Sequence, residues 1–247
     1  MTGHNTLFVV EGHDDEKFLK RMLRVCNISC DNNEYVYESS IHVLISSLFT
    51  DDMLDEDLDV LMSLKEREKD DNKKEILSKG FENIYFVFDL DPQDNNADYE
   101  KISKLLDFLD DPTDNGKLYI NYPMLESYRH LTSLHDQKFK GRKVSLSVLN
   151  RGLYKSIVDR ECHKGLKQNA NYDEKCFITI TKMHMMKMNY ILNGEYELMS
   201  EDEFLNSTGS DVFNEQHRLM ENDGEVYVLN TSVFIVADYK PSLFFKH

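Results

Sequence analysis

The stretch I-Y-F-V-F-D-L-D at residues 84–91 decides the expected fold. Its apolar part, residues 84–88, has no polar position and is typical of a strand buried on both faces of a parallel sheet. Asp89 and Asp91 follow at once, two positions apart. The stretch therefore predicts a central buried strand whose exit carries a pair of carboxylates.

A second strand exit lies in T-L-F-V-V-E-G-H-D-D at residues 6–15. The strand-like residues 6–10 stop at Glu11, and a helix with apolar residues at 3.6-residue spacing then begins near Asp14 and Asp15. Acidic residues are favoured in the first turn of any helix. The helix start alone therefore explains one of these two aspartates, Asp14 or Asp15.

The chain up to residue 135 alternates between predicted strands and helices, which indicates an α/β fold: a Rossmann-like parallel sheet flanked by helices. The predicted strands are 6–10, 34–38, 84–88 and 118–121, and the predicted helices are 41–49, 53–65, 98–109 and one that starts at Pro123.

Beyond residue 135 the strand signal fades, and residues 136–247 are expected to form a mostly helical extension. Residues 172–192 predict a long helix, while residues 226–239 suit either a strand or a helix. The apolar segment 226–245 would fit a homodimer contact or a core role equally well.

The charge distribution is uneven along the chain, whose formal net charge is −16. Residues 129–187 carry 13 Lys and Arg against 5 Asp and Glu, a net charge of +8. This basic block is either an ordinary solvated surface or a contact for phosphate backbones.

Composition also bounds the compartment. No run of apolar residues is long enough for a membrane span, and no signal peptide is recognisable at the start. The four cysteines lack paired C-x-x-C spacing, so reduced thiols are expected rather than a zinc site. A cytoplasmic protein without a membrane partner is the expectation.

The two strand exits predict a metal site. Carboxyl ends of parallel strands lie at one edge of a sheet, and Asp89 and Asp91 would point to the same side. Clustered carboxylates repel one another, and a hard divalent cation such as Mg²⁺ removes that repulsion. Asp94 is within reach as a further ligand. An acidic turn without a metal is the simpler alternative.

Two motifs resemble the TOPRIM family. V-V-E-G-H-D-D-E-K-F-L (residues 9–19) resembles its first motif, and F-V-F-D-L-D-P-Q-D (residues 86–94) resembles its D-x-D motif. The resemblance implies a TOPRIM core over residues 1–135 with an acidic insertion near 50–78. The glycine that often follows D-x-D in the family is absent, and Asp94 stands near its place.

A third stretch, N-Y-P-M-L-E-S-Y-R-H-L at residues 121–131, resembles the Pro-x-x-Glu helix of bacterial defence TOPRIM proteins. These include the RloB-like group, OLD-type nucleases and the effector of the phage anti-restriction-induced system. The resemblance implies an endonuclease that acts as the toxic effector of a two-gene anti-phage system beside an ABC-type ATPase. Its substrate would be tRNA in preference to DNA.

The resemblance also implies roles for particular residues. Glu11, Asp89 and Asp91 would be catalytic, and Mg²⁺ or Mn²⁺ would be bound by Glu11, Asp15, Asp89, Asp91, Asp94 and Glu126. For Glu126, an exposed helix position is an equally good explanation. Residues of the basic block that could hold the nucleic acid are Lys140, Arg142, Lys143, Lys155, Lys164 and Lys167.

Other functions fit the residues less well. A phosphatase of the haloacid dehalogenase type also uses D-x-D after a buried strand, but it leaves Glu11 without a role. No P-loop motif is present, so the chain is not expected to be an ATPase itself. The second serious hypothesis is a non-catalytic subunit that docks a basic partner through the acidic residues 51–59.

Overall fold

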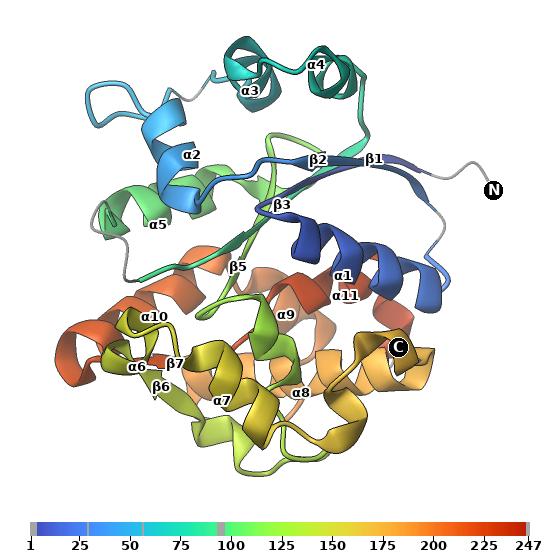
Figure 1. Ribbon diagram of the computed structural model, residues 1–247, viewed down its shortest axis with the longest axis vertical. Helices are drawn as coiled ribbons and strands as arrows, with labels where there is room; N and C mark the ends of the chain where they lie inside the picture. Colours follow the sequence, from blue (N-terminus) through green and yellow to red (C-terminus); the bar gives the residue numbers. More distant parts are fainter. Residues whose placement is uncertain (1–3, 29, 56, 93–96, 246–247) are drawn as a thin grey trace.

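The computed structural model describes residues 4–28, 30–55, 57–92 and 97–245. Its centre is a five-stranded sheet in the order β2-β1-β3-β5-β4, parallel except for the short antiparallel edge strand β4 (Figure 1). The predicted α/β class with a mostly parallel sheet is confirmed. The strands are β1 (His4–Val10), β2 (Cys30–Val36), β3 (Asn83–Asp89), β4 (Asp110–Asp111) and β5 (Gly116–Asn121).

The helices cover both faces of this sheet. The chain moves from β1 to β2 in one direction and from β3 to β5 in the other, so right-handed crossovers place the connecting helices on opposite faces. Figure 1 shows α1 below the sheet and α2 and α5 above it. The helices of this half are α1 (His13–Val25), α2 (Ile41–Leu48), α3 (Val60–Arg67), α4 (Asp71–Leu77) and α5 (Tyr99–Phe108).

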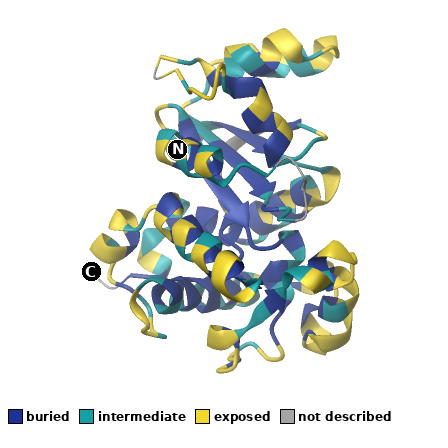
Figure 2. Cartoon of the chain, turned by 90° about the vertical axis from the view of Figure 1, so that its left-hand side faces the viewer, coloured by how far each residue is buried: buried dark blue, intermediate teal, exposed yellow. Residues whose placement is uncertain are grey.

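β3 is the buried central strand that its sequence predicts. Tyr85 to Phe88 are all buried, and the strand pairs with β1 on one side and β5 on the other. Figure 2 shows the dark-blue sheet enclosed between helices, with the exposed α3 and α4 region at one end of the molecule.

The C-terminal half contains helices, 3₁₀ turns and a two-stranded antiparallel sheet of β6 and β7. Its buried apolar side chains form one cluster with those of the sheet. Arg21 on α1 donates to the carbonyl of Tyr172 at 2.9 Å. The elements of the C-terminal half include η1 (Leu125–Arg129), η2 (Phe139–Gly141), β6 (Lys143–Ser145), α6 (Leu146–Asn150), α7 (Tyr154–Glu161), α8 (Glu174–Asn193), α9 (Glu201–Asn206), α10 (Gly209–Asp223), β7 (Glu225–Tyr227), η5 (Ser232–Phe234) and α11 (Ile235–Tyr239).

The described helices are all too short or too polar to cross a membrane.

Two predicted helices are wrong in part. The helix expected over 53–65 begins only at Val60, because the Asp59 side chain caps it by accepting from the N–H of Met62. The helix expected from Pro123 is a short 3₁₀ turn that starts at Leu125. The Tyr122–Pro123 peptide bond is cis, and the N–H of Tyr122 donates to Leu229, so the backbone here is not helical.

The two ambiguous regions have mixed structure. Residues 226–239 contain part of β7, then η5 and α11, so neither a single strand nor a single helix forms. The turn expected over 110–116 begins with the edge strand β4. The proposed boundary between a core at 1–135 and an extension at 136–247 stays a prediction.

Candidate metal site

The predicted site lies where the strand order reverses. β1 and β3 are neighbours, and their connections leave in opposite directions, which is the point where open α/β sheets bind ligands. Glu11 follows β1 and Asp89 ends β3. The N–H of Asp89 donates to Oε2 of Glu11 at 2.9 Å, so the two strand exits are in direct contact.

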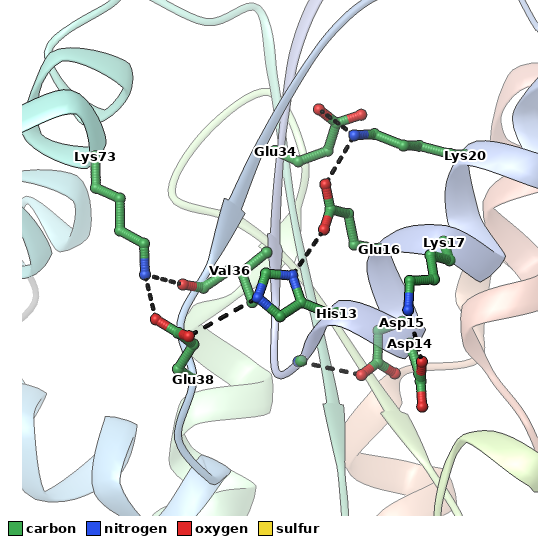
Figure 3. Close-up of polar contacts among 11 residues, drawn as sticks. His13, Asp14, Asp15, Glu16, Lys17, Lys20, Glu34, Val36, Glu38 and Lys73 are labelled. Atoms are coloured by element: carbon green, nitrogen blue, oxygen red, sulfur yellow. Dashed lines mark hydrogen bonds and ion pairs between the residues drawn. The ribbon is translucent and has the colours of Figure 1, made fainter.

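Asp15 reaches the same place from the first turn of α1. Its Oδ2 accepts from the N–H of Gly12 at 3.2 Å, and its side chain is only 6% exposed. Its other oxygen, Oδ1, is buried and has no hydrogen-bond partner among the described residues. Asp14 is 80% exposed and pairs with Lys17 at 3.3 Å (Figure 3). Of these two aspartates, only Asp15 therefore has a buried oxygen placed for a ligand.

Asp89 is held from several sides. Its carboxylate accepts from the backbone N–H of Leu125 and, at 3.4 Å, from Nδ2 of Asn121 at the end of β5. Asn121 is fully buried. The first aspartate of D-x-D is thus fixed by the exit of the next strand.

Asp91, the second aspartate of D-x-D, has a left-handed backbone with φ of +45°. Its carbonyl lies 3.3 Å from Nε2 of His42, a buried residue of α2. Since a carbonyl only accepts, this contact requires the proton on Nε2. Asp94, the further predicted ligand, lies outside the described residues.

Glu126 is part of η1 rather than an exposed helix position. Its Oε1 lies 3.1 Å from Nζ of Lys155, and its side chain is 15% exposed. Its Oε2 is buried without a hydrogen-bond partner among the described residues. Of the two explanations for Glu126, the geometry favours the site.

The carboxylates hold protons more tightly than usual. Burial, opposed by the hydrogen bond from Asp89 and helped by the charges of Asp91 and Asp15, raises the pKa of Glu11 from 4.5 to about 8. Burial is also the largest cause that raises the pKa of Asp15 to about 6, and Glu126 adds to it. The pKa of Asp89 is raised well above its usual range by burial and then by Asp15 and Glu11.

The donor set fits a hard divalent cation. Every candidate ligand is a carboxylate oxygen, which Mg²⁺ and Mn²⁺ favour, and two of these oxygens are buried without partners. Within the described ranges, no three His, Cys, Asp or Glu side chains already stand in an arrangement that could hold a metal ion. The carboxylates would have to turn toward a common point, and Glu11 would leave the N–H of Asp89.

The predicted nucleic-acid contacts of the basic block fall into three groups. Arg142 and Lys143 are bound within the protein: Arg142 pairs with Asp136 at 2.9 Å, and Lys143 lies 3.4 Å from Glu225. Lys155 lies at the carboxylates, as its contact with Glu126 shows. The other predicted nucleic-acid contacts are exposed: Lys140, Lys164 and Lys167.

A partly open pocket of about 150 Å³ lies elsewhere, between β5, α9 and α10. It is lined by apolar residues such as Leu118, Phe204 and Val212 and contains none of the predicted site residues. The candidate site is therefore at the sheet edge and not in this pocket.

Sequence reasoning missed three features of the site. Asn121 is a polar residue at a strand exit, so the rule that found Glu11 and Asp89 could have found it. Lys155 was expected only as a nucleic-acid contact, and nothing in the local sequence indicates its partner Glu126. His42 carries no local signal, because its contact with Asp91 joins α2 to a distant strand exit.

Comparison with known proteins gives no match: no family model, no curated protein and no solved structure is similar to this chain.

Proposed function

We propose that the protein is a Mg²⁺- or Mn²⁺-dependent endonuclease with a TOPRIM-like core. One observation carries this proposal: carboxylates from four segments, the exit of β1, α1, β3 and η1, lie close together where the strand order reverses. Asp15 and Glu126 each bring an unpartnered buried oxygen. Burying such a group of acids is costly unless a cation compensates it. A purely structural acidic turn would leave these oxygens in water.

The residues of the site would share the work of cutting a phosphodiester. Asp15, Asp89, Asp91 and Glu126 would hold the metal, with Asp94 as the further predicted ligand. A divalent ion bound there would supply an activated water and stabilise charge at phosphorus. Glu11, whose pKa of about 8 lies near neutral pH, would accept a proton from the attacking water.

Lys155 would bind the phosphate of the substrate. Its Nζ now lies 3.1 Å from Glu126, yet its side chain is 63% exposed, so it can turn toward a ligand in solvent. Burial lowers its pKa, but Glu126 outweighs this and raises the pKa overall, so the ammonium group stays charged. A charged donor beside the metal ligands is what a phosphate oxygen requires.

The biological role that we propose rests on the three motifs quoted above. The protein would be the toxic effector of a two-gene anti-phage system in the cytoplasm, released or activated by an ABC-type ATPase partner. The exposed Lys140, Lys164 and Lys167 would contact the nucleic acid, with tRNA favoured over DNA.

Cleavage of nucleic acid tests this proposal. The protein, alone and with a candidate ABC-type ATPase partner, is incubated with tRNA and with plasmid DNA in Mg²⁺, in Mn²⁺ and in EDTA. Cleavage that needs the metal and is lost in Glu11→Gln and Asp89→Asn supports the proposal. Asp14→Asn is the matched control, because Asp14 is exposed and pairs only with Lys17. Equal cleavage by all variants would contradict it.

A non-catalytic role in docking a partner is the second candidate. Met53 and Met62 are 72% and 58% exposed beside the acidic residues 51–59, and exposed apolar groups are common at protein contacts. Such a subunit would gain little stability from Mn²⁺. A metal-binding enzyme would gain about 2.7 kcal/mol at a Mn²⁺ concentration of 100 Kd.

A further inference from the structure

Polar side chains of the C-terminal half, together with Asn121 of β5, are buried close to the segments that carry the carboxylates. Asn121, His184, Asn230 and Ser232 are all 0% exposed. Polar groups at such depth must find hydrogen-bond partners, and these partners fix the geometry around them. The bonds that they form lead to Glu126 and Asp89.

Asn230 holds the backbone of η1 beside Glu126. Its Nδ2 donates to the carbonyl of Leu125 at 3.1 Å, across 105 positions of the chain. Its Oδ1 accepts from Oγ of Ser232 at 2.8 Å and from the N–H of Val233 at 3.2 Å, which fixes the amide orientation.

His184 on α8 holds the other end of η1. Its Nδ1 accepts from the N–H of Asn230 at 3.0 Å, so its Nε2 carries the proton and donates to the carbonyl of Tyr128 at 3.3 Å. Burial lowers the pKa of His184 to about 3, so the ring is neutral at neutral pH, as this pattern requires. The carbonyls of Leu125 and Tyr128, on either side of Glu126, are thus both bound by the C-terminal half.

The same segment supports Asp89. The N–H of Ser232 donates to Oδ1 of Asn121 at 3.4 Å, and Nδ2 of Asn121 donates to Asp89. The N–H of Leu125 also donates to the Asp89 carboxylate. Residues 230–232 therefore bind Asn121, which donates to Asp89, and also bind the carbonyl of Leu125, the residue before Glu126.

We infer that Asn230, with His184 and Ser232, is a positioning residue that sets Glu126 and Asp89 for metal binding. The effect on metal binding rests on the proposed function, whereas the restraint of η1 and Asn121 rests on the hydrogen bonds described above. It makes the C-terminal half a working part of the site, because β1, β3 and β5 alone do not fix η1. Residues that hold metal ligands in place by hydrogen bonds orient those ligands, and mutating such a residue commonly weakens metal binding 10–100-fold.

Asn230→Ala and Thr231→Val provide a matched test. Thr231 is the next residue and is also buried, but its Oγ1 donates to the carbonyl of Ile120 in β5 and not to η1. Each variant loses buried hydrogen bonds from the same segment, and only Asn230→Ala releases Leu125. Two readouts are measured on the full chain: the Kd for Mn²⁺ by calorimetric titration and hydrogen exchange of the amides of residues 124–130 without metal.

For Asn230→Ala, the Kd for Mn²⁺ should rise about 10–100-fold and exchange over residues 124–130 should be about tenfold faster. Thr231→Val should leave both close to wild type. Equal behaviour of the two variants, or an unchanged Asn230→Ala, would overturn the inference. If Asn230→Ala does not fold, Ser232→Ala removes one bond to Oδ1 of Asn230 and should shift both readouts in the same direction.

The two readouts separate this inference from the proposed function. Wild-type protein that binds no Mn²⁺ would contradict the metal site, and the exchange data would then decide the positioning role alone. Wild-type protein that binds Mn²⁺ and shows no effect of Asn230→Ala would contradict only the positioning role.

Discussion

Glu11 illustrates, at the scale of single residues, how burial and proposed chemistry are linked. It lies at a strand exit among other acids, and burial is the largest reason for its raised pKa. The same proton that reduces the electrostatic cost in the metal-free protein must leave when a cation binds. Stability and metal binding are therefore coupled through this residue.

The first prediction concerns the pH dependence of stability in the absence of metal. The pKa of Glu11 is about 8 in the folded protein against 4.5 ordinarily, so the folded state binds more protons between these pH values. The contribution of Glu11 is therefore present below pH 4.5 and is lost as the pH rises through about 8. Glu11→Gln should gain stability over wild type as the pH rises, as measured by urea unfolding in EDTA.

Glu16 on the same helix is the control for this prediction. Its hydrogen bonds with Lys20 and then His13 lower its pKa, so Glu16→Gln should show the opposite sign: a loss relative to wild type above the ordinary pKa of 4.5. A difference curve for Glu11→Gln that is flat with pH would show that Glu11 is not buried as described.

The second prediction concerns Lys155. Because its ammonium group lies beside Glu126 and would meet the substrate phosphate, Lys155→Gln should lower kcat/KM for cleavage by about 100-fold. The side chain of Lys155 is 63% exposed, so solvent screens its pair with Glu126 and the urea midpoint should change little. Lys138→Gln, which removes an exposed lysine of the same block that is not among the predicted nucleic-acid contacts, is the control. Equal activity of both variants would remove Lys155 from the site.

Single residues of the site were predictable from sequence where strand exits carry them. Glu11 and Asp89 follow apolar strands, and Asp15 follows the exit by one helical turn. His42 could not be predicted, because its contact with the Asp91 carbonyl depends on how α2 packs on the sheet.

At the scale of elements, the strands were more predictable than the loops. β1, β3 and β5 are specified by their own apolar residues, and their parallel pairing follows from the alternation with helices, whereas their order is seen only in the structure. Residues 122–129 look helical by composition but form a bend and a 3₁₀ turn. Their backbone groups are bound by Leu229, His184 and Asn230, which lie far away in the chain.

The third prediction concerns the basic block as an element. Arg142 is 13% exposed and its partner Asp136 only 3%, so Arg142→Gln leaves a buried carboxylate without its cation. The expected loss is about 3–5 kcal/mol in the free energy of unfolding. Lys164→Gln should change it by less than about 0.5 kcal/mol. Urea unfolding measures both.

This result would separate structural from substrate-binding cations in the block. A destabilised Arg142→Gln whose cleavage per folded molecule is normal fits the account. An Arg142→Gln that unfolds like wild type but binds nucleic acid poorly would contradict it.

At the scale of the whole molecule, the alternating N-terminal half predicted the class of fold, and the structure adds the contribution of the C-terminal half. The predicted extension is not peripheral to the site, since Asn230 and His184 bind the turn that carries Glu126. No local pattern could indicate this, because the bonds join residues more than 50 positions apart. The net charge of −16 likewise does not indicate that a lysine lies at the carboxylates.

The central claim is that the carboxylates form a divalent-cation site, and Mn²⁺ titration at pH 7 with simultaneous measurement of proton release tests it most directly. Glu11, with a pKa of about 8, should release its proton when the ion binds, and Asp89, whose pKa is raised well above its usual range, should add to the release. Wild type and Asp14→Asn should bind Mn²⁺ and release these protons, whereas Asp15→Asn should bind at least about tenfold more weakly. Binding by Asp15→Asn equal to that of Asp14→Asn, or no binding by wild type, would contradict the account.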